Sequence, residues 1–400
     1  MRLYNTQSQT IEEVTPRDGH IGIYVCGVTP YDTTHAGHAF TYIVYDVIIR
    51  YLRAQGVNVT YVQNVTDIDD DILRKAKEVG LDWQELGQRE IRKFRKDLDD
   101  LNILSPDHYV AATDHIAEVI EITQKLVDLG LAYESQGSVY YSVEKDPEFG
   151  KLSHLAPEDW LSVANQHGNF PDDPKKRNPI DFVLWQAAQP GEPTWETPWG
   201  PGRPGWHIEC SAMSTKYLGP QVDIHGGGSD LIFPHHECEI AQTEPITGVE
   251  PFVRYWAHVG MVGYQGEKMS KSLGNLVKAS DVLETYTADA FRLYLLSHPY
   301  RFAWEYYDRE LTDIWVGVAS TIAQASTIAS SGEPAAIDSD AFRARFTGAL
   351  DNDLDTASAI TVLREFADAI LAAAPTADVT AAQTTLRALG DILGLTFEIR

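Results

Sequence analysis

The sequence predicts an α/β fold in which one parallel sheet is assembled from two separated stretches of chain and is followed by a helical region. The first observation is a βαβ pattern, because strand-like apolar runs at 21–27 and 57–62 flank a segment of helical periodicity at 35–55. The second is the return of strand-like runs at 222–225 and 255–259, each near a helical segment. An insertion is therefore expected to separate the two halves of the sheet.

The stretch between these halves has a mixed pattern. Helical periodicity dominates from 70 to 129 with a break at Pro106, and 133–143 is typical of a hairpin with its turn at Gln136-Gly137. Residues 157–204 are rich in Pro, Gly, Asp and Trp, which predicts an ordered insertion with long loops.

The last part of the chain is Ala-rich and helical from 311 onward, with 330–340 as an inter-helix loop. We expect four parts in all. They are a first sheet half at 1–115, a connective insertion at 116–204, a second sheet half at 205–310 and a helical bundle at 311–400.

Composition narrows the class of protein. A chain of 400 residues can bury a large core, and three cysteines are too few for a disulfide framework, which favours a cytoplasmic protein. No apolar run reaches eighteen residues and the N-terminus lacks a signal-peptide core, so no membrane span is expected. The net charge is −26 and no lysine follows Lys278, which argues against extensive nucleic-acid contact through the C-terminal region.

Two short segments predict nucleotide chemistry. Residues 35–38 (His-Ala-Gly-His) open the first predicted helix, where free backbone N–H groups and the helix dipole suit a triphosphate and Gly37 permits close approach. Residues 268–272 (Lys-Met-Ser-Lys-Ser) form a loop whose lysines and hydroxyls suit the charge that develops on a leaving pyrophosphate. Both segments lie beside strand-like runs, so together they indicate ATP activation.

Cys26, Cys210, His235 and Glu239 form a candidate zinc site. His235 and Glu239 are four residues apart on a predicted helix and share a face, while Cys26 ends a strand at the edge where open α/β sheets bind ligands. Spacing alone leaves His236 and Cys238 open as alternative ligands.

For several other residues the sequence is compatible with either a structural or a binding role. Thr66 follows a strand-like run, where either it or Asp67 suits a helix N-cap. His225 precedes three glycines that either approach a nucleotide or form a tight turn, and Asp230 suits a ribose or adenine contact. Trp206 alone is typical of a core residue.

With these segments the chain resembles the class I aminoacyl-tRNA synthetases, and within them the cysteinyl-tRNA synthetases. Further landmarks of the resemblance are residues 24–27 (Tyr-Val-Cys-Gly), 64–70, 205–210 (Gly-Trp-His-Ile-Glu-Cys), 223–230 and 233–237. The resemblance implies a Rossmann-type catalytic domain split by the insertion and a C-terminal helical bundle, and with the chain ending at Arg400 no anticodon-binding domain is expected after the bundle. A similar sibling family is the cysteine ligase of mycothiol biosynthesis.

The resemblance also implies roles for individual residues. One Zn²⁺ is held by Cys26, Cys210, His235 and Glu239, and ATP enters with Mg²⁺. Catalysis is assigned to His35, His38, Lys268 and Lys271. Cysteine binding is assigned to Cys26, Gly27, Thr66, Trp206 and His225. ATP binding is assigned to His35, Gly37, His38, Gly226, Gly227, Asp230, Lys268, Ser270, Lys271 and Ser272.

Zinc has a physical reason in such a site. An apolar pocket discriminates poorly between cysteine and the near-isosteric serine, whereas a soft thiolate bound to zinc provides an energy difference that a hydroxyl does not match.

The acceptor of the activated cysteine is the remaining choice. Glu239, the segment 176–179 and the run 223–230 resemble the synthetases, and we favour L-cysteine, ATP and tRNA(Cys) as the substrates of a monomeric enzyme. The chain end at Arg400 and the segments 26–32 and 61–64 resemble the mycothiol-type ligase, whose acceptor is a glucosaminyl-inositol amine. An inactive paralogue with a binding role is the alternative of another class.

Overall fold

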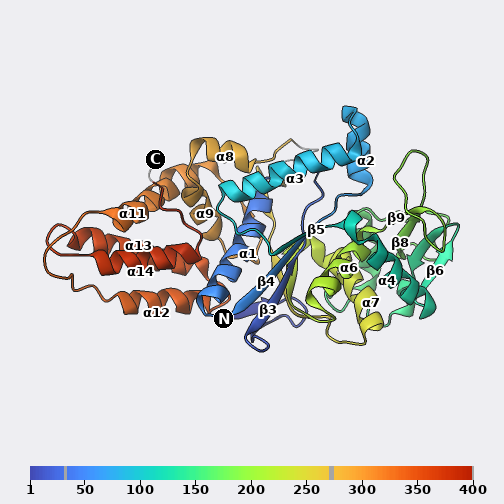
Figure 1. The fold of residues 1–400 in the computed structure, drawn as a ribbon, viewed down its shortest axis with the longest axis horizontal. Coiled ribbons are helices and arrows are strands. Elements are labelled where there is room, and N and C mark those ends of the chain that lie inside the picture. Colours follow the sequence, from blue (N-terminus) through green and yellow to red (C-terminus); the bar gives the residue numbers. More distant parts are fainter. Residues whose placement is uncertain (31–33, 270–273, 399–400) are drawn as a thin grey trace.

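A computed structural model describes residues 1–30, 34–269 and 274–398, apart from the side chain of Lys268. At its centre is a five-stranded parallel sheet with the strand order β11-β10-β3-β4-β5 (Figure 1). The strands are β3 (His20–Val25), β4 (Asn58–Val65), β5 (His108–Ala111), β10 (Val222–Gly228) and β11 (Val253–Val259). Because β3 pairs with β10, the two stretches of chain meet in the middle of one sheet, as the sequence predicts.

Helix α1 (Ala36–Ala54) follows β3 and is buried along nearly its whole circumference. Tyr45 and Val47 point to different sides of the helix, yet neither reaches solvent. The helix is enclosed because it packs against β4 on one side and against α9 (Ala288–Leu296) and α14 (Thr380–Ile392) on the other. Its N-terminus is therefore held rigidly at the edge of the sheet.

The insertion has its own four-stranded antiparallel sheet and its own apolar core, and lies at one end of the elongated molecule (Figure 1). The predicted hairpin is confirmed, since Gln136 and Gly137 form its turn with φ values of 53° and 80°. The insertion's elements are α4 (Ile116–Asp128), β6 (Ala132–Ser135), β7 (Ser138–Tyr141), α5 (Pro157–Asn165), β8 (Phe182–Ala187) and β9 (Gly202–Pro204). Helices α6 (Trp206–Leu218) and α7 (Glu237–Thr247) lie between this sheet and the central one.

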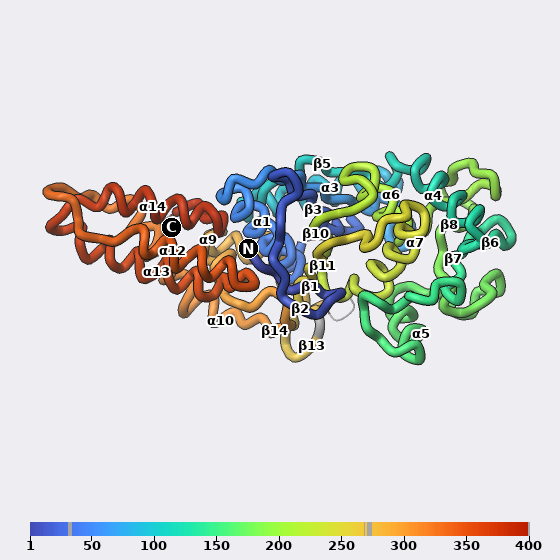
Figure 2. Tube along the Cα trace, turned by 90° about the horizontal axis from the view of Figure 1, so that it is seen from below, coloured from blue at the N-terminus to red at the C-terminus, as the bar shows by residue number. Residues whose placement is uncertain are grey.

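The C-terminal helices form a bundle at the opposite end of the molecule, as Figure 2 shows from a second direction. A small sheet of β12 (Val262–Tyr264), β13 (Glu267–Lys268) and β14 (Trp304–Glu305) and helix α8 (Ala279–Thr285) precede it. The helices of the bundle are α11 (Val316–Thr327), α12 (Ser339–Leu350), α13 (Thr356–Ala373) and α14. The predicted helical region is thus confirmed.

Two expectations were wrong in detail. The stretch expected to be helical from 70 to 129 contains α2 (Asp70–Val79), α3 (Trp83–Asp100) and α4, but also the edge strand β5. The strand β8 lies where long loops were expected, and it is the central partner of β7 and β9. Whether a short segment forms a strand depends more on the neighbouring strand that it pairs with than on its own residues. A four-residue edge strand between helices is also too short to show an alternating apolar pattern in the sequence.

None of the helices within the described ranges combines the length and the apolar composition that crossing a bilayer requires.

Candidate functional site

A cavity of about 1160 Å³ opens at the carboxyl ends of the central strands. Cys26 and Gly27 follow β3, Thr66 follows β4, and Gly228 ends β10. The insertion, α2 and α3 complete the walls. Other residues that line it include His35, Gly37, His38, Asp69, Asp70, Arg74, Phe94, Phe170, Trp206, His207, Cys210, Asp230 and His235.

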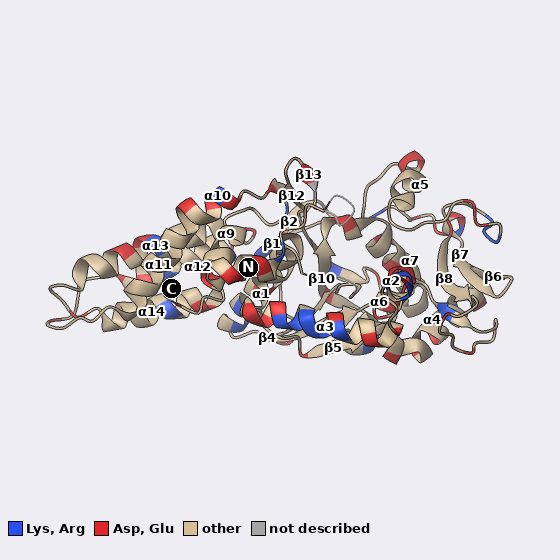
Figure 3. Cartoon of the chain, turned by 90° about the horizontal axis from the view of Figure 1, so that it is seen from above, with Lys and Arg blue, Asp and Glu red and all other residues tan. Residues whose placement is uncertain are grey.

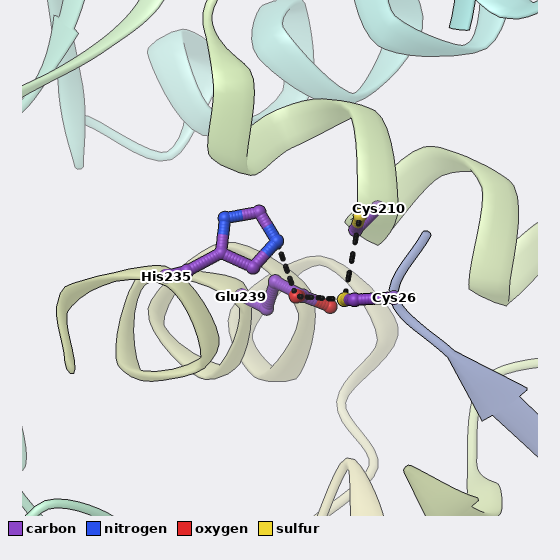
Figure 4. Close-up of side chains that lie close together, drawn as sticks. All are labelled: Cys26, Cys210, His235 and Glu239. Carbon is purple, nitrogen blue, oxygen red and sulfur yellow. Dashed lines mark hydrogen bonds and ion pairs between the residues drawn. The ribbon is translucent and has the colours of Figure 1, made fainter. Parts of the chain in front are cut away.

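Cys26, Cys210 and His235 line this cavity, and the buried carboxylate of Glu239 converges on them from outside the lining (Figure 4). Their candidate ligand atoms all lie within 4.8 Å of one another, and all four side chains are buried. The two sulfur atoms are 3.8 Å apart. Glu239 Oε1 lies 3.1 Å from Nε2 of His235 and 3.9 Å from Sγ of Cys26.

Three separate elements bring this cluster together. The backbone N–H of Cys26 donates to the carbonyl of Gly226, which extends the β3–β10 pairing by one residue. Cys210 lies on the second turn of α6. His235 lies in a π-helical turn (Ile232–His236) that continues into α7, so Glu239 follows one turn later on the same face, as its spacing predicts.

A second arrangement shares two of these residues. Cys26, His225, His236 and Glu239 also bring their ligand atoms within 4.8 Å. Sγ of Cys26 lies 3.3 Å from Nε2 of His236. Cys238, the other alternative left open by spacing, belongs to neither cluster and packs in the apolar core of the insertion.

The pKa values of the cluster are shifted in opposite directions, and burial raises the pKa of the Cys26 thiol. Burial opposes ionisation of Cys210, but the hydrogen bond with Cys26 and the charge of His235 outweigh it and lower its pKa to about 6. Burial likewise opposes ionisation of Glu239, whereas His225 and His235 lower its pKa to about 2. Burial disfavours charge on His235, yet Cys210 and Glu239 raise its pKa to about 10. Two ionised groups therefore face one buried cation.

This donor set fits a zinc ion. Two cysteine sulfurs, an imidazole nitrogen and a carboxylate oxygen are zinc ligands, and burial keeps water away from them. The negative charge of Cys210 and Glu239 has to be balanced in such a buried place.

Further histidines surround the cluster. The sequence did not indicate a role for two of them, His207 and His258. Nδ1 of His207 lies 2.9 Å from Nδ1 of His235, on the side of the ring that faces away from Glu239. Nδ1 of His236 lies 2.7 Å from Nε2 of His258, and the other ring nitrogen of His258, Nδ1, lies 2.7 Å from Oγ1 of Thr6. Burial lowers the pKa values of His207 and His236 well below the ordinary range, so both rings are neutral. These contacts join distant segments, so no spacing in the sequence signals them.

The N-terminus of α1 forms another part of the cavity wall. His35 is the N-cap, and its Nδ1 accepts from the backbone N–H groups of Gly37 at 3.1 Å and His38 at 3.4 Å. The His35 and His38 rings stack with centroids 3.8 Å apart. The two histidines and the glycine therefore lie together, beside Asp230 in the same cavity.

Other residues predicted to bind ATP lie elsewhere or outside the described part. Gly226 and Gly227 do not line the cavity. A Cβ at Gly226 would lie 1.7 Å from the carbonyl oxygen of Ala257, so strand packing accounts for this glycine. Ser270, Lys271 and Ser272 and the side chain of Lys268 lie outside the described residues.

Most residues predicted to bind cysteine share the cavity. Thr66 and Trp206 line it near Cys26, and the Trp206 ring centroid is 4.3 Å from that of His235. His225 lies behind Glu239, outside the lining. The capping alternative for Thr66 and Asp67 is wrong, because α2 is capped by Asp69, whose side chain accepts from Ile72 N at 2.8 Å.

Comparison with known sequences gives a family for most of the chain. The family model described as "tRNA synthetases class I (C) catalytic domain" matches residues 12–315, and one described as "DALR domain" matches 345–398. A protein of Dehalococcoides mccartyi named cysteine–tRNA ligase is 46% identical over 401 residues, which cover 99% of this chain and 86% of the relative. A protein of the same name from Thermodesulfovibrio yellowstonii is 47% identical over 384 residues, covering 92% and 78%.

Solved structures agree on the fold. Mycobacterium tuberculosis methionyl-tRNA synthetase in complex with methionyl-adenylate superposes with a TM-score of 0.66 at 17% identity, covering 94% of this chain and 89% of that one. The LeuRS of Agrobacterium radiobacter K84, in a ternary complex, has a TM-score of 0.66 at 11% identity, covering 93% and 83%. The chain therefore belongs to the class I (C) family of tRNA synthetases.

Proposed function

We propose that this chain is a cysteine–tRNA ligase, which activates L-cysteine with ATP and transfers it to tRNA(Cys). The observation that carries the substrate choice is the buried cluster of Cys26, Cys210, His235 and Glu239 beside the cavity. Relatives 46–47% identical over more than nine-tenths of the chain bear the name cysteine–tRNA ligase.

The cluster is proposed to hold one Zn²⁺, which supplies a soft Lewis acid for the substrate thiolate. Cys26, Cys210, His235 and Glu239 would be its protein ligands. Trp206 lines the cavity beside His235 and is proposed to exclude water from the substrate side chain. Thr66 is proposed to contact the substrate amino group, with the carboxylate of Asp69 in the same lining attracting the ammonium charge.

The opposite end of the cavity is proposed to hold ATP with Mg²⁺. His35, Gly37 and His38 surround the N-terminus of α1, where backbone N–H groups and the helix dipole favour the phosphates. Lys268 and Lys271 are proposed to stabilise the charge that accumulates on the leaving group, with Ser270 and Ser272 as further donors. Asp230 is proposed to contact the nucleoside.

The first step is then an in-line displacement that needs no protein nucleophile. A carboxylate oxygen of cysteine attacks the α-phosphorus, the bond to the bridging oxygen breaks, and pyrophosphate leaves with that electron pair. In the second step a ribose hydroxyl at the tRNA 3′ end attacks the cysteinyl carbonyl and AMP leaves. The protein contributes position and charge to both steps. The four-part division at 1–115, 116–204, 205–310 and 311–400 remains our proposal for its domains.

Cysteine-dependent exchange of pyrophosphate into ATP tests the first step, with serine as the matched competitor. The same sample is then offered a tRNA(Cys) transcript and glucosaminyl-inositol in parallel. The proposal expects exchange with cysteine, little with serine, and transfer to the tRNA alone. Transfer to the sugar amine alone would make the chain a thiol-biosynthesis ligase, and a lack of exchange by the zinc-loaded protein would contradict an enzymatic role.

A further inference from the structure

Lys and Arg residues are concentrated in the middle of α3, a helix that also carries acidic residues in its first turn and at its C-terminal end. Residues 89–96 of α3 contain five Lys or Arg residues and one Glu, although the whole chain carries a net charge of −26. Figure 3 shows these cations as blue segments along α3, separated by red and tan residues. A concentration of this kind in an otherwise negative surface marks where a polyanion meets the least repulsion.

Four of the cations share one face of α3. Arg89, Arg92, Lys93 and Lys96 are three, four and seven residues apart, which places them within about one-third of the circumference. All four side chains are exposed. We call these four residues the α3 basic face.

The α3 basic face is only partly neutralised within the protein. Arg89 pairs with its neighbour Glu90, and Lys96 pairs with Asp100. Arg92 and Lys93 form no ion pair within the described part of the chain. The Lys96–Asp100 pair is exposed on both sides, and exposed pairs are typically worth less than about 1 kcal/mol, so phosphate groups compete with it readily, whereas the Glu90 side chain is only 11% exposed.

The opposite side of α3 belongs to the wall of the active-site cavity. Phe94 is buried, lines the cavity and packs edge-on against Tyr42 with ring centroids 5.4 Å apart. Arg74 and Lys75 of α2, which packs against α3, line the same cavity. From this end α3 runs along the surface towards α8 and the C-terminal half of the molecule (Figure 1). A ligand that leaves the cavity past α2 would therefore meet the α3 basic face next.

The other basic cluster of the sequence, Lys175, Lys176 and Arg177, contacts neighbouring residues of the insertion. Lys175 Nζ donates to Ser138 Oγ at 3.3 Å, and Lys176 Nζ donates to Asn169 Oδ1 at 2.5 Å. The Arg177 guanidinium lies 4.0 Å from the centre of the Tyr133 ring. These contacts tie the cations to the insertion and leave α3 as the better candidate surface.

We propose that the α3 basic face binds the phosphate backbone of the tRNA whose 3′ end enters the cavity. This inference rests on the proposed function, since it takes tRNA as the acceptor. The contact is to phosphates and carries no base recognition, so it positions the RNA and accelerates its encounter with the enzyme. It also supplies a basic surface in a chain that has no lysine after Lys278.

The test compares two full-length variants of equal charge. In the first, R89Q/R92Q/K93Q/K96Q removes the α3 basic face. In the second, R309Q/R343Q/R345Q/R364Q removes four exposed arginines from the C-terminal helical region and lowers the net charge by the same amount. Binding of a tRNA(Cys) transcript is measured between 50 and 200 mM salt, and cysteine-dependent pyrophosphate exchange reports on the fold and the adenylation site.

We expect the α3 variant to bind the transcript about 10-fold or more weakly than the control variant at 100 mM salt. The slope of log Kd against log salt should fall by about two to four, because each lost phosphate contact removes about one released counterion. Exchange activity should stay within about two-fold of wild type in both variants, since none of these residues touches the cavity.

Equal binding by the two variants, with wild type charging its tRNA, would overturn this inference and leave the proposed function standing. Wild type that exchanges pyrophosphate but neither binds nor charges tRNA would contradict the tRNA part of the proposed function, and the inference with it. If the α3 variant loses exchange activity, the single variants R92Q and K93Q are compared with wild type instead. Each should change the slope of log Kd against log salt by about one.

Discussion

Glu239 and His225 are joined by a hydrogen bond of 2.8 Å between Oε2 and Nε2, in a part of the molecule that solvent does not reach. The other carboxylate oxygen, Oε1, faces His235 and Cys26. Glu239 thus presents one oxygen to the proposed metal and has its second oxygen held by a fixed imidazole. The His225 ring is itself fixed by stacking on Trp256, with centroids 4.7 Å apart.

This relationship predicts that His225 orients a metal ligand. His225→Ala should lower zinc affinity by about 10- to 100-fold, because groups that orient metal ligands typically contribute that much. Competition with a chromophoric chelator measures the affinity directly. A rise in KM for cysteine with zinc affinity unchanged would instead show that His225 contacts the substrate.

Cys210 on α6 and Cys238 on α7 are both buried thiols, so substituting each in turn gives a variant and its control. Cys210→Ser should reduce bound zinc well below one equivalent per chain, whereas Cys238→Ser should leave it unchanged, because Cys238 lies in the apolar core of the insertion. Metal content after dialysis is measured by atomic absorption. Loss of zinc in Cys238→Ser, or its retention in Cys210→Ser, would contradict the ligand assignment.

His35 caps the N-terminus of α1 and is also proposed to act on ATP. One substitution distinguishes the two roles. Asparagine is a good N-cap, so His35→Asn should keep the thermal midpoint of wild type. If the imidazole also acts on the nucleotide, kcat for pyrophosphate exchange should fall by about 10²-fold or more. An active His35→Asn enzyme would reduce His35 to a helix cap.

The buried carboxyl group of Asp69 is expected to make the stability of the fold depend on pH. Burial is the main cause that raises its pKa to about 6, against about 3.9 in the unfolded chain. The folded state therefore retains a proton that the unfolded state has lost, and this contribution to stability is full below about pH 4 and lost as the pH rises through 6. Asp69→Asn keeps a capping oxygen but does not ionise.

The free energy of unfolding of the Asp69→Asn variant should rise by about 2 kcal/mol relative to that of wild type between pH 4 and pH 7. Urea unfolding at several pH values measures the difference, and Asp82→Asn, the exposed N-cap of α3, controls for the change of cap. A constant difference across this range would show that Asp69 is already ionised at low pH.

The contact between α1 and the C-terminal region predicts a large effect on stability. Asp46 accepts from the guanidinium of Arg292, and both side chains are fully buried. Asp46→Asn leaves the Arg292 charge without a counterion and should destabilise the fold by about 3–5 kcal/mol. Arg53→Gln, which breaks an exposed pair with Asp107, should cost less than about 1 kcal/mol. Similar unfolding midpoints for the two variants would contradict this account.

The sequence predicted the parts of the fold and site that depend on local pattern. The split parallel sheet follows from the βαβ pattern, and His235 and Glu239 meet because they lie one helical turn apart. The hairpin at Gln136-Gly137 follows from turn chemistry. In each case the signal lies within a few consecutive residues.

Long-range contacts explain what was not predicted. His207 and His235 meet only because α6 packs against the turn before α7. Gly226 was assigned to the nucleotide, but its lack of a side chain is required by a carbonyl on β11. β5 has little apolar periodicity of its own and is a strand because β4 offers it hydrogen bonds. A single sequence shows none of these partners.

The central claim is that a metal held by Cys26, Cys210, His235 and Glu239 recognises the thiolate of cysteine. The most direct test uses protein in which Co²⁺ replaces Zn²⁺, titrated with cysteine or with serine while the sulfur-to-cobalt charge-transfer absorption is recorded. The account predicts that cysteine strengthens and shifts this absorption at one equivalent per chain, whereas serine leaves it unchanged. Identical spectra with both amino acids, in protein that still exchanges pyrophosphate with cysteine, would show that the metal is structural and that selection occurs elsewhere.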